Sequence, residues 1–445
     1  MESSIEMLLI LLASIALIVF LIMKVRLNAF VALIIACIFL GLATRMPLAK
    51  IAGAIEAGMG GTLGFLATIL GLGTILGKML EVSGGAERLA LTLIKAFGQS
   101  RAHWAMMIVG FLCGLPVFFQ VGFVLLIPLI FSVALEARMS LAKIGIPVVA
   151  GLITVHCIVP PHPAAMAITG TLHADVGKVI LYGIIVGLPA ASIAGPIYGS
   201  IIAKWVKLNP PEHLFKAESM PVEKLPPFGT TLFTILLPLL IMVGKTIIDL
   251  TVSKDASFMP LVSFIGNPIT ALLISALVSY WTLGLARGLN KADLLKITDG
   301  CFGPIAGILL IIGAGGAFNR VILDSGMGKV IAAVLTSMNL SPLIMAWVIA
   351  IAMRFSVGSA TVAMMTSAGI ILPVLANYPA LDPALVCVAV GAGAIGLSHV
   401  NDSGLWIVKE FFGMSLTDTF KTWTASTTIA AVVGLIGVLL LSAVV

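Results

Sequence analysis

Apolar runs long enough to cross a lipid bilayer follow one another along almost the whole chain of 445 residues. A membrane-spanning helix needs about 20 apolar residues, and candidate runs lie near 7–23, 28–44, 104–134, 179–203, 228–249, 266–286, 303–323, 343–376 and 422–445. Charged residues make up 10% of the chain and apolar residues 60%, against about 25% and about 45–50% in soluble proteins. We therefore predict an all-α, multi-pass membrane protein, which excludes an ordinary soluble enzyme and a disordered chain.

The distribution of charge predicts an orientation in the membrane rather than a charged partner. The net charge is +6, but no Lys/Arg run is interleaved with aromatic residues, so we expect no nucleic-acid partner. Glu2 and Glu6 precede the first apolar run, and Lys24 and Arg26 follow it. A cleaved signal peptide has the opposite order. The first run is thus expected to be a retained helix with a periplasmic N-terminus.

One segment of soluble composition divides the chain nearly in half. Residues 204–229, rich in Pro, Lys and Glu, are predicted to be a solvated linker between a first membrane repeat, 1–203, and a second, 230–445. Two stretches support this division, because GLGTILGKMLEVSG at 71–84 aligns with GAGGAFNRVILDSG at 313–326, and His156 aligns with His399 further on. Secondary transporters are commonly built from two such halves, often with inverted topology.

The glycines in these two aligned stretches have two interpretations. They could let helices pack closely, or they could mark the tips of broken helices whose backbone N–H groups hold an anion. The second interpretation makes substrate-binding candidates of Gly71, Gly73, Thr74, Gly315, Gly316 and Asn319.

Three further segments interrupt apolar runs with polar or helix-breaking residues. TVHCIVPPHP at 154–163 contains His156 and His162, and SHVNDSG at 398–404 contains Ser398, His399, Asn401 and Asp402. The third, RFSVGSATVAMMT at 354–366, offers Ser359 and Thr361, and its counterpart GLPVFFQVG at 114–122 contains Gln120. Ionisable residues within membrane segments are costly and usually functional, although short loops at the membrane surface would also explain the first two segments.

Other motifs are missing from the sequence. No GxxxxGK[ST] phosphate loop, HExxH or GxSxG motif occurs, and the histidines have no Cys or carboxylate at metal-ligand spacing. We therefore expect no cofactor, no metal and no enzyme activity, and any transport must draw on an ion gradient.

Several of these segments resemble the gluconate:proton symporter family of bacteria, which also includes transporters for related sugar acids and for D-serine. The resemblance is carried by GGTLGFLATILGLGTILGKMLEVSGGAERLA, VHCIVPPHPAA, FIGNPITA, LLIIGAGGAFNRVILDSG, RFSVGSATVAMMTSAG and LSHVNDSGLWIVKEFF. It implies a secondary transporter of the inner membrane with inverted repeats, broken helices, re-entrant hairpins, a scaffold that dimerises and an elevator-like motion. Two positions depart from the family pattern: Gln120 stands where many members have an acid, and Ala164–Ala165 follows PPHP, as in members of the D-serine type.

We predict proton-coupled uptake of a small hydroxylated carboxylate, with gluconate as the first candidate. D-serine or another sugar acid is the alternative substrate, and a passive channel is the alternative class. The partners are then a small anionic or zwitterionic substrate, protons, the lipid bilayer and a second copy of the chain. Asp402 is the first candidate for the proton, followed by His156 and His399, because a carboxyl group away from water can carry a proton. The remaining candidates contact the substrate, with hydroxyl or amide groups at Ser359, Thr361, Ser398, Asn401 and Asn319 and with His162 on the cavity wall.

Overall fold

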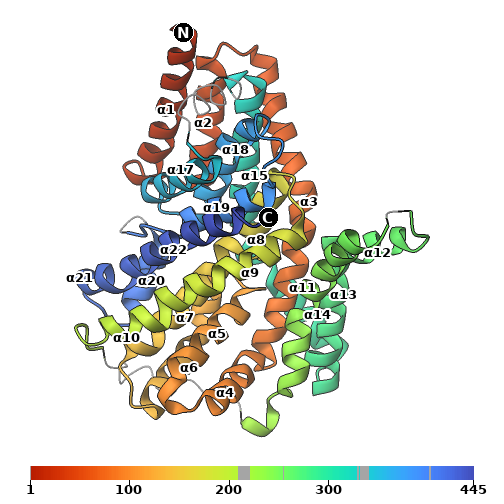
Figure 1. Cartoon of the computed structure of the whole chain (residues 1–445), viewed down its shortest axis with the longest axis vertical. Coiled ribbons are helices and arrows are strands. Elements are labelled where there is room, and N and C mark those ends of the chain that lie inside the picture. The colour runs from red at the N-terminus through yellow and green to blue at the C-terminus, as the bar shows by residue number, and fades with distance from the viewer. Residues whose placement is uncertain (1, 209–220, 254, 328–329, 331–339, 400–401) are drawn as a thin grey trace.

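Every regular element that the structure describes is a helix, as the composition predicts (Figure 1). The structure, a computed structural model, describes the whole chain except residues 1, 209–220, 254, 328–329, 331–339 and 400–401. Within the described residues, six helices of at least 18 residues are long and apolar enough to cross a membrane. The chain is therefore a multi-pass membrane protein.

The helices of the first half are short and closely spaced, apart from one long helix, α3. They are α1 (Glu2–Met23), α2 (Ala29–Ala43), α3 (Leu48–Val82), α4 (Gly85–Phe97), the 3-10 helix η1 (Gln99–Arg101), α5 (Ala102–Gly114), α6 (Phe119–Glu136), α7 (Leu141–Ile158), α8 (Pro163–Thr171), α9 (Val176–Ser192), the π-helix η2 (Ile193–Ile197) and α10 (Tyr198–Ile202).

The second half repeats several of these features. It contains the 3-10 helix η4 (Val222–Lys224), α11 (Phe228–Thr251), α12 (Met259–Ile265), α13 (Pro268–Ser279), the π-helix η5 (Tyr280–Gly284), the 3-10 helix η6 (Leu285–Arg287), α14 (Lys291–Cys301), α15 (Gly303–Asp324), α17 (Pro342–Val357), α18 (Ala360–Leu375), α19 (Pro383–Ile395), α20 (Ser403–Phe411), α21 (Leu416–Thr419), the π-helix η7 (Phe420–Thr424) and α22 (Ala425–Ser442).

Matching residues in the two halves occupy matching local structures. Asn28 and Asn267 cap α2 and α13, and each side chain accepts a hydrogen bond from a first-turn N–H at 2.8 and 2.9 Å. Gly84 follows α3 and Gly326 follows α15, with φ of +72° and +78°, a conformation that favours glycine. The duplication remains a prediction, and these paired features support it.

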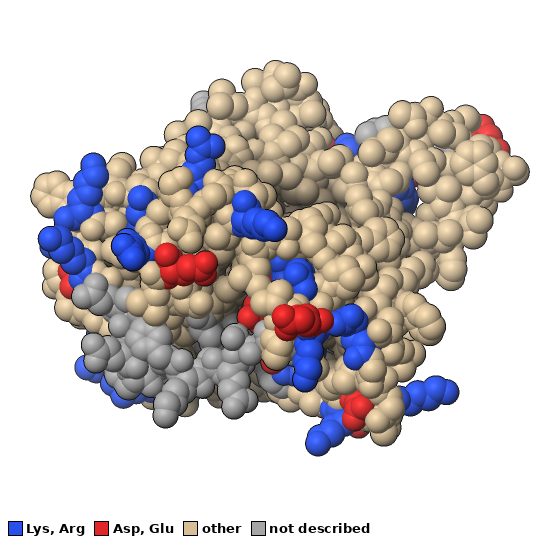
Figure 2. Space-filling model, turned by 90° about the horizontal axis from the view of Figure 1, so that it is seen from below, with Lys and Arg blue, Asp and Glu red and all other residues tan. Residues whose placement is uncertain are grey.

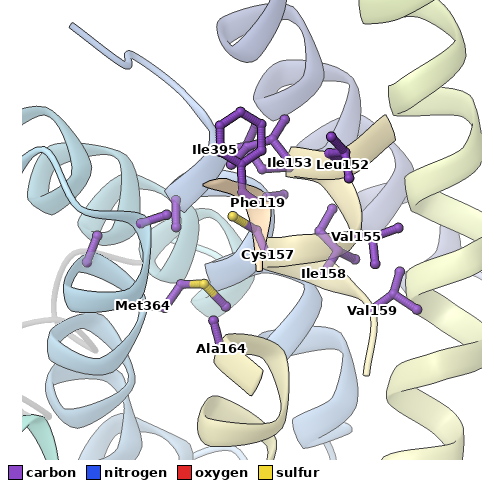
Figure 3. Packing of buried hydrophobic residues seen from close by; sticks show 14 of the residues in the cluster. Phe119, Leu152, Ile153, Val155, Cys157, Ile158, Val159, Ala164, Met364 and Ile395 are labelled. Carbon is purple, nitrogen blue, oxygen red and sulfur yellow. The ribbon is translucent and has the colours of Figure 1, made fainter. Parts of the chain in front are cut away.

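Helix α7 lies at the centre of the molecule, and all of its residues except Lys143 are buried. Figure 3 shows Cys157 and Ile158 near its end, close to Ala164 of α8, Met364 of α18 and Ile395 of α19. Helices α7 and α19 approach closely because Gly391 has no side chain. A Cβ atom there would lie 2.2 Å from the carbonyl oxygen of Cys157.

Two arginines, one from each half, hold the end of the segment that joins the halves. Arg88 of α4 donates to the carbonyl oxygens of Val222 and Pro226 at 2.8 Å. Arg287 of η6 donates to the carbonyl oxygen of Lys224 at 2.8 Å, and both arginines reach that of Leu225 at 3.3 Å. The described part of the predicted linker, 204–208 and 221–229, thus includes a stretch that is fixed to both halves.

Candidate functional site

Three helix breaks meet at one cavity of about 220 Å³, called here the central cavity, and a fourth lies behind its His156 wall. The breaks separate α5 from α6, α7 from α8, α17 from α18 and α19 from α20. The cavity is lined by Phe118, Phe119, Gln120, Ile153, His156, Ile311, Arg354, Ser359, Ala360, Thr361, Asp402, Ser403, Gly404 and Trp423. Three sequence segments expected to interrupt the membrane helices thus come together with their counterpart at 114–122.

The sequence explains where the helices break. Pro116 follows α5, and Pro160 and Pro161 follow α7. Proline has no backbone N–H, so none of the three can donate the hydrogen bond that would continue the helix. Gly358 ends α17 with φ of +77°, and the Ser359 side chain then accepts from the N–H of Val362 at 3.4 Å to begin α18. Asp402 begins α20 by accepting from the N–H of Gly404 at 2.9 Å.

Helix N-termini and a guanidinium contribute positive charge to the wall of the central cavity, and the Asp402 carboxylate on the same wall offsets part of it. Helices α6, α18 and α20 all begin there, and the first-turn N–H groups of a helix have no partner within the helix. A helix N-terminus carries a partial positive charge that favours anions. The guanidinium of Arg354, only 2% exposed, adds a full positive charge. The cavity can therefore hold an organic anion.

Asp402 is the carboxylate on this wall, and it is fully engaged. Its Oδ2 accepts hydrogen bonds from the Arg354 guanidinium and from the Ser398 hydroxyl, and its Oδ1 accepts from Gly404. Trp423 of η7 donates to the Ser398 hydroxyl at 2.6 Å. An acid, a base and their supporting hydroxyl are thus fixed in one buried network beside the cavity.

The two histidines of the Pro-rich segment form a buried pair behind the wall. Their ring centroids are 4.2 Å apart, and His156 lines the cavity. His162 is 0% exposed; its Nδ1 accepts from the N–H of Ala164 at 3.3 Å and so begins α8. The Nδ1 of His156 and the Nε2 of His162 have no hydrogen-bond partner.

Two more cavities lie next to helix α3. The first, about 320 Å³ and called the Thr74 cavity, is lined by Thr74, Gly77, Lys78, Glu81, Pro116, Val117, Phe118, Gln120, Val121, Gly300 and Cys301. It shares Phe118 and Gln120 with the central cavity, so these two side chains separate the cavities. The second, about 560 Å³ and called the Asn319 cavity, is formed by residues of α3, α8 and α15 together with the turn that follows α8.

The residues expected from the sequence fall into three groups. Those on the central cavity are His156, Ser359, Thr361 and Asp402. Those behind or beside its wall are His162, Ser398 and His399. The Nε2 of His399 lies 2.6 Å from the carbonyl oxygen of Phe355. Those elsewhere are Thr74, on the Thr74 cavity, and Gly71, Gly73, Gly315, Gly316 and Asn319. Asn401 lies outside the described residues.

The expectation that the glycine stretches form broken helix tips is wrong. Both lie inside continuous helices, α3 and α15, where backbone N–H groups serve the helix itself. A Cβ on Gly316 would lie 2.0 Å from the hydroxyl of Thr62 and 2.7 Å from the carbonyl oxygen of Gly58, so this glycine lets α3 and α15 pack together. Gly315 packs against Met365, whereas Gly73 has nothing within 4 Å.

Sequence reasoning missed the aromatic part of the site. Phe118, Phe119 and Trp423 line the cavity, and the rings of Phe119 and Trp423 are 5.1 Å apart. A Trp within an apolar run gives no signal that sets it apart from an ordinary membrane residue. Phe118 and Phe119 lay within a segment that the sequence did single out.

A polar cavity enclosed by broken helices within a membrane bundle is typical of a membrane transport protein. A sequence model described as GntP family permease matches residues 6–444. The chain belongs to the GntP permease family. It is therefore a permease and not an enzyme.

Individual relatives match over nearly the whole chain. A gluconate permease of Pseudomonas aeruginosa is 47% identical over 95% of this chain and 94% of its own. The D-serine transporter DsdX of Escherichia coli K12 is 46% identical over 99% of both chains. Among solved structures, the YdaH transporter of Alcanivorax borkumensis has a TM-score of 0.65 at 14% identity over 89% of each chain, which shows a shared fold.

Proposed function

We propose that this protein couples the inward movement of protons to the uptake of a small sugar acid, with gluconate as the first candidate. Relatives named as gluconate permeases, at 42–47% identity, support this substrate class. The observation that carries the proposal is the central cavity, where three helix N-termini and Arg354 surround one space.

The substrate carboxylate is assigned to the N-termini of α6 and α18 and to the Arg354 guanidinium. Each helix end favours an anion by about 0.3–1 kcal/mol, and by up to about 2 kcal/mol where it is partly buried. The substrate hydroxyls then meet Gln120, Ser359, Thr361 and Ser403, which line the same cavity. The glycine stretches and Asn319 are left out of this site because they do not line the central cavity.

The proton is assigned to Asp402 because Arg354 cannot serve two carboxylates equally well. While Asp402 is ionised, it holds the guanidinium. A proton on Asp402 removes that charge and frees Arg354 for the substrate carboxylate. Binding of the proton therefore favours binding of the substrate, which is the coupling that a symporter requires.

The same ion pair favours a sugar acid over a zwitterion. Asp402 is the acidic residue that lines the described central cavity, and it is already paired with Arg354. An amino acid such as D-serine would also need a negative partner for its ammonium group. D-serine remains the alternative substrate, supported by the relative DsdX.

We further propose that the two halves form inverted repeats that move in an elevator-like manner. The Thr74 cavity and the Asn319 cavity use equivalent positions: Thr74, Gly77, Lys78 and Glu81 in one, and Gly316, Asn319, Arg320 and Leu323 in the other, each 242 residues further along. Helices α3 and α15 pack antiparallel, since Gly58 faces Gly316 and Leu63 faces Gly313. An inverted pair of repeats would place such cavities at opposite ends of α3.

The charge distribution supports an orientation in the membrane, which we propose to be the inner membrane of a bacterium. Figure 2 shows Lys and Arg gathered on one face with fewer Asp and Glu, and the start of α1 lies at the opposite end of the molecule (Figure 1). By the positive-inside rule, that face is cytoplasmic and the N-terminus periplasmic. A homodimer is also proposed, and the mass of the purified protein in detergent tests it.

Transport by purified protein in proteoliposomes tests the main proposal. An imposed pH gradient, acidic outside, should drive accumulation of labelled gluconate above its external concentration, and related aldonates should compete better than D-serine. Asp402→Asn should abolish accumulation yet still exchange internal for external gluconate. Uptake that stops at equal concentrations would indicate a channel, and an Asp402→Asn variant that still accumulates gluconate would remove the proton assignment.

A further inference from the structure

The Asn319 cavity contains a buried amide with no partner. Asn319 is 5% exposed, lines the cavity, and has no hydrogen-bond partner for either Oδ1 or Nδ2. A buried polar group without a partner costs about 1–3 kcal/mol. Such groups in native proteins usually bind ordered water. A cavity of about 560 Å³ beside the amide has room for water.

Two helices run side by side from the central cavity to the Asn319 cavity. Helix α18 begins at the central cavity, and α8 begins at His162, behind His156. Figure 3 shows Ala164 of α8 beside Met364 of α18 near their starts. At the far end, residues of α8 line the Asn319 cavity, and the Asn319 amide lies where a Cβ on Gly369 of α18 would be.

Unpartnered polar atoms occur along this pair of helices. Between its two ends, Thr366 and Ser367 of α18 are 0% exposed, and neither hydroxyl has a partner. Other buried hydroxyls do have a partner; those of Thr169 and Ser275, for example, donate to the carbonyl four residues earlier at 2.7 Å. The His162 Nε2 and the His156 Nδ1 continue the series to the central cavity.

We propose that these groups form a hydrated proton path between the Asn319 cavity and Asp402. The path runs from Asn319 past Thr366 and Ser367 to His162 and His156, and it leaves the Thr74 cavity to the substrate. Along α3, which borders both outer cavities, Thr62 and Thr74 are about 18 Å apart at 1.5 Å per residue. Proton and substrate thus reach the central cavity from different places.

Each transfer along the path moves one proton and no electrons. A water or imidazole breaks one O–H or N–H bond as the next acceptor forms its own. A hydronium ion at the Asn319 cavity thus loses one proton and becomes water, and one O–H bond forms on the Asp402 carboxylate. The charged or titratable groups nearby are Arg354 beside Asp402, and Arg320 and His173 on the Asn319 cavity. Arg320 is paired with Asp324 at 2.9 Å.

This inference rests on the proposed symport, and the test distinguishes a failure of the proton path from a failure of the symport itself. In proteoliposomes, the double variant Thr366→Val, Ser367→Ala should lose about ten-fold or more of gluconate uptake driven by a pH gradient, because positioned proton-transfer groups contribute at least that much. Exchange of internal for external gluconate should stay near the wild-type rate, because one-for-one exchange needs no net proton transfer. The matched control is Ser275→Ala, which removes a buried hydroxyl that has a partner.

The variant should still fold, because neither hydroxyl has a hydrogen bond to another protein group to lose. A second variant, Asn319→Leu, tests the other end of the path and should also lose driven uptake while keeping exchange. Driven uptake at the wild-type level in both variants would overturn the path, as would parallel losses of uptake and exchange. If the wild-type protein shows no response to a pH gradient, the proposed symport itself fails.

Discussion

The Arg354 guanidinium, near the end of α17, donates to the Asp402 carboxylate at the start of α20, and the two side chains are only 2% and 7% exposed. Arg354 also donates to the carbonyl oxygen of Gly358, where α17 ends. The pair therefore joins the helix breaks at α17 and α20 to each other. A change in the charge of Asp402 therefore changes how strongly Arg354 can attract the substrate carboxylate at its proposed position.

Breaking this pair from one side should be more harmful than removing both charges. Arg354→Gln leaves an unpaired buried carboxylate, and removal of one partner of a buried pair costs about 3–5 kcal/mol. The double variant Arg354→Gln, Asp402→Asn should recover most of this stability. Thermal unfolding of the purified proteins measures both the loss of stability in Arg354→Gln and its recovery in the double variant. Neither variant should accumulate gluconate, and a double variant that does so would contradict the role of Arg354.

Ser359 and Thr361 line the same cavity but should differ in what they stabilise. Ser359→Ala removes both a cavity hydroxyl and the cap of α18, so it should cost about 1 kcal/mol of stability as well as substrate affinity. Thr361→Val should weaken binding of gluconate with little effect on unfolding. Competition assays and melting temperatures separate the two effects. Equal melting losses in both variants would show that the Ser359 cap does not matter.

Gln120 separates the central cavity from the Thr74 cavity, and we expect a negative charge there to inhibit transport. Gln120→Glu places a second carboxylate at the N-terminus of α6, where it competes with the substrate for the positive wall. The Michaelis constant for gluconate should rise about ten-fold, which corresponds to about 1.4 kcal/mol. Gln120→Met, similar in size and neutral, is the control. If both variants have the same affinity, charge at this position is irrelevant.

Gly391 should be among the glycines that tolerate alanine least. The new Cβ would lie 2.2 Å from the carbonyl oxygen of Cys157, so α7 and α19 must separate, at a cost of about 1–3 kcal/mol or more. Gly53 of α3 has nothing within 4 Å, and Gly53→Ala should stabilise the helix by about 0.5–1 kcal/mol. Melting temperatures of the two variants in one detergent make the comparison. A tolerated Gly391→Ala would mean that the two helices can move apart.

The sequence predicted the helical membrane fold and most of the helix breaks, because prolines, hydroxyls and charges are rare in apolar runs and therefore conspicuous. His156, Ser359, Thr361 and Asp402 came from such segments and line the central cavity. The glycine stretches misled, because glycine serves close packing and helix breaking equally well. The structure decides in favour of close packing, because α3 and α15 are continuous and Thr62 lies directly against Gly316. Trp423 could not be found, since its place beside Ser398 depends on tertiary contacts.

Arg88 and Arg287 both donate hydrogen bonds to backbone carbonyl oxygens within residues 222–226. These bonds restrict movement of α4 relative to η6. Because helix α4 and the 3-10 helix η6 both bind this segment, we expect the two elements to keep their positions relative to each other. We therefore expect displacement during transport to occur at the interrupted helices, away from this contact. Cutting the chain within 222–226 would release that restraint without touching a single residue of the central cavity.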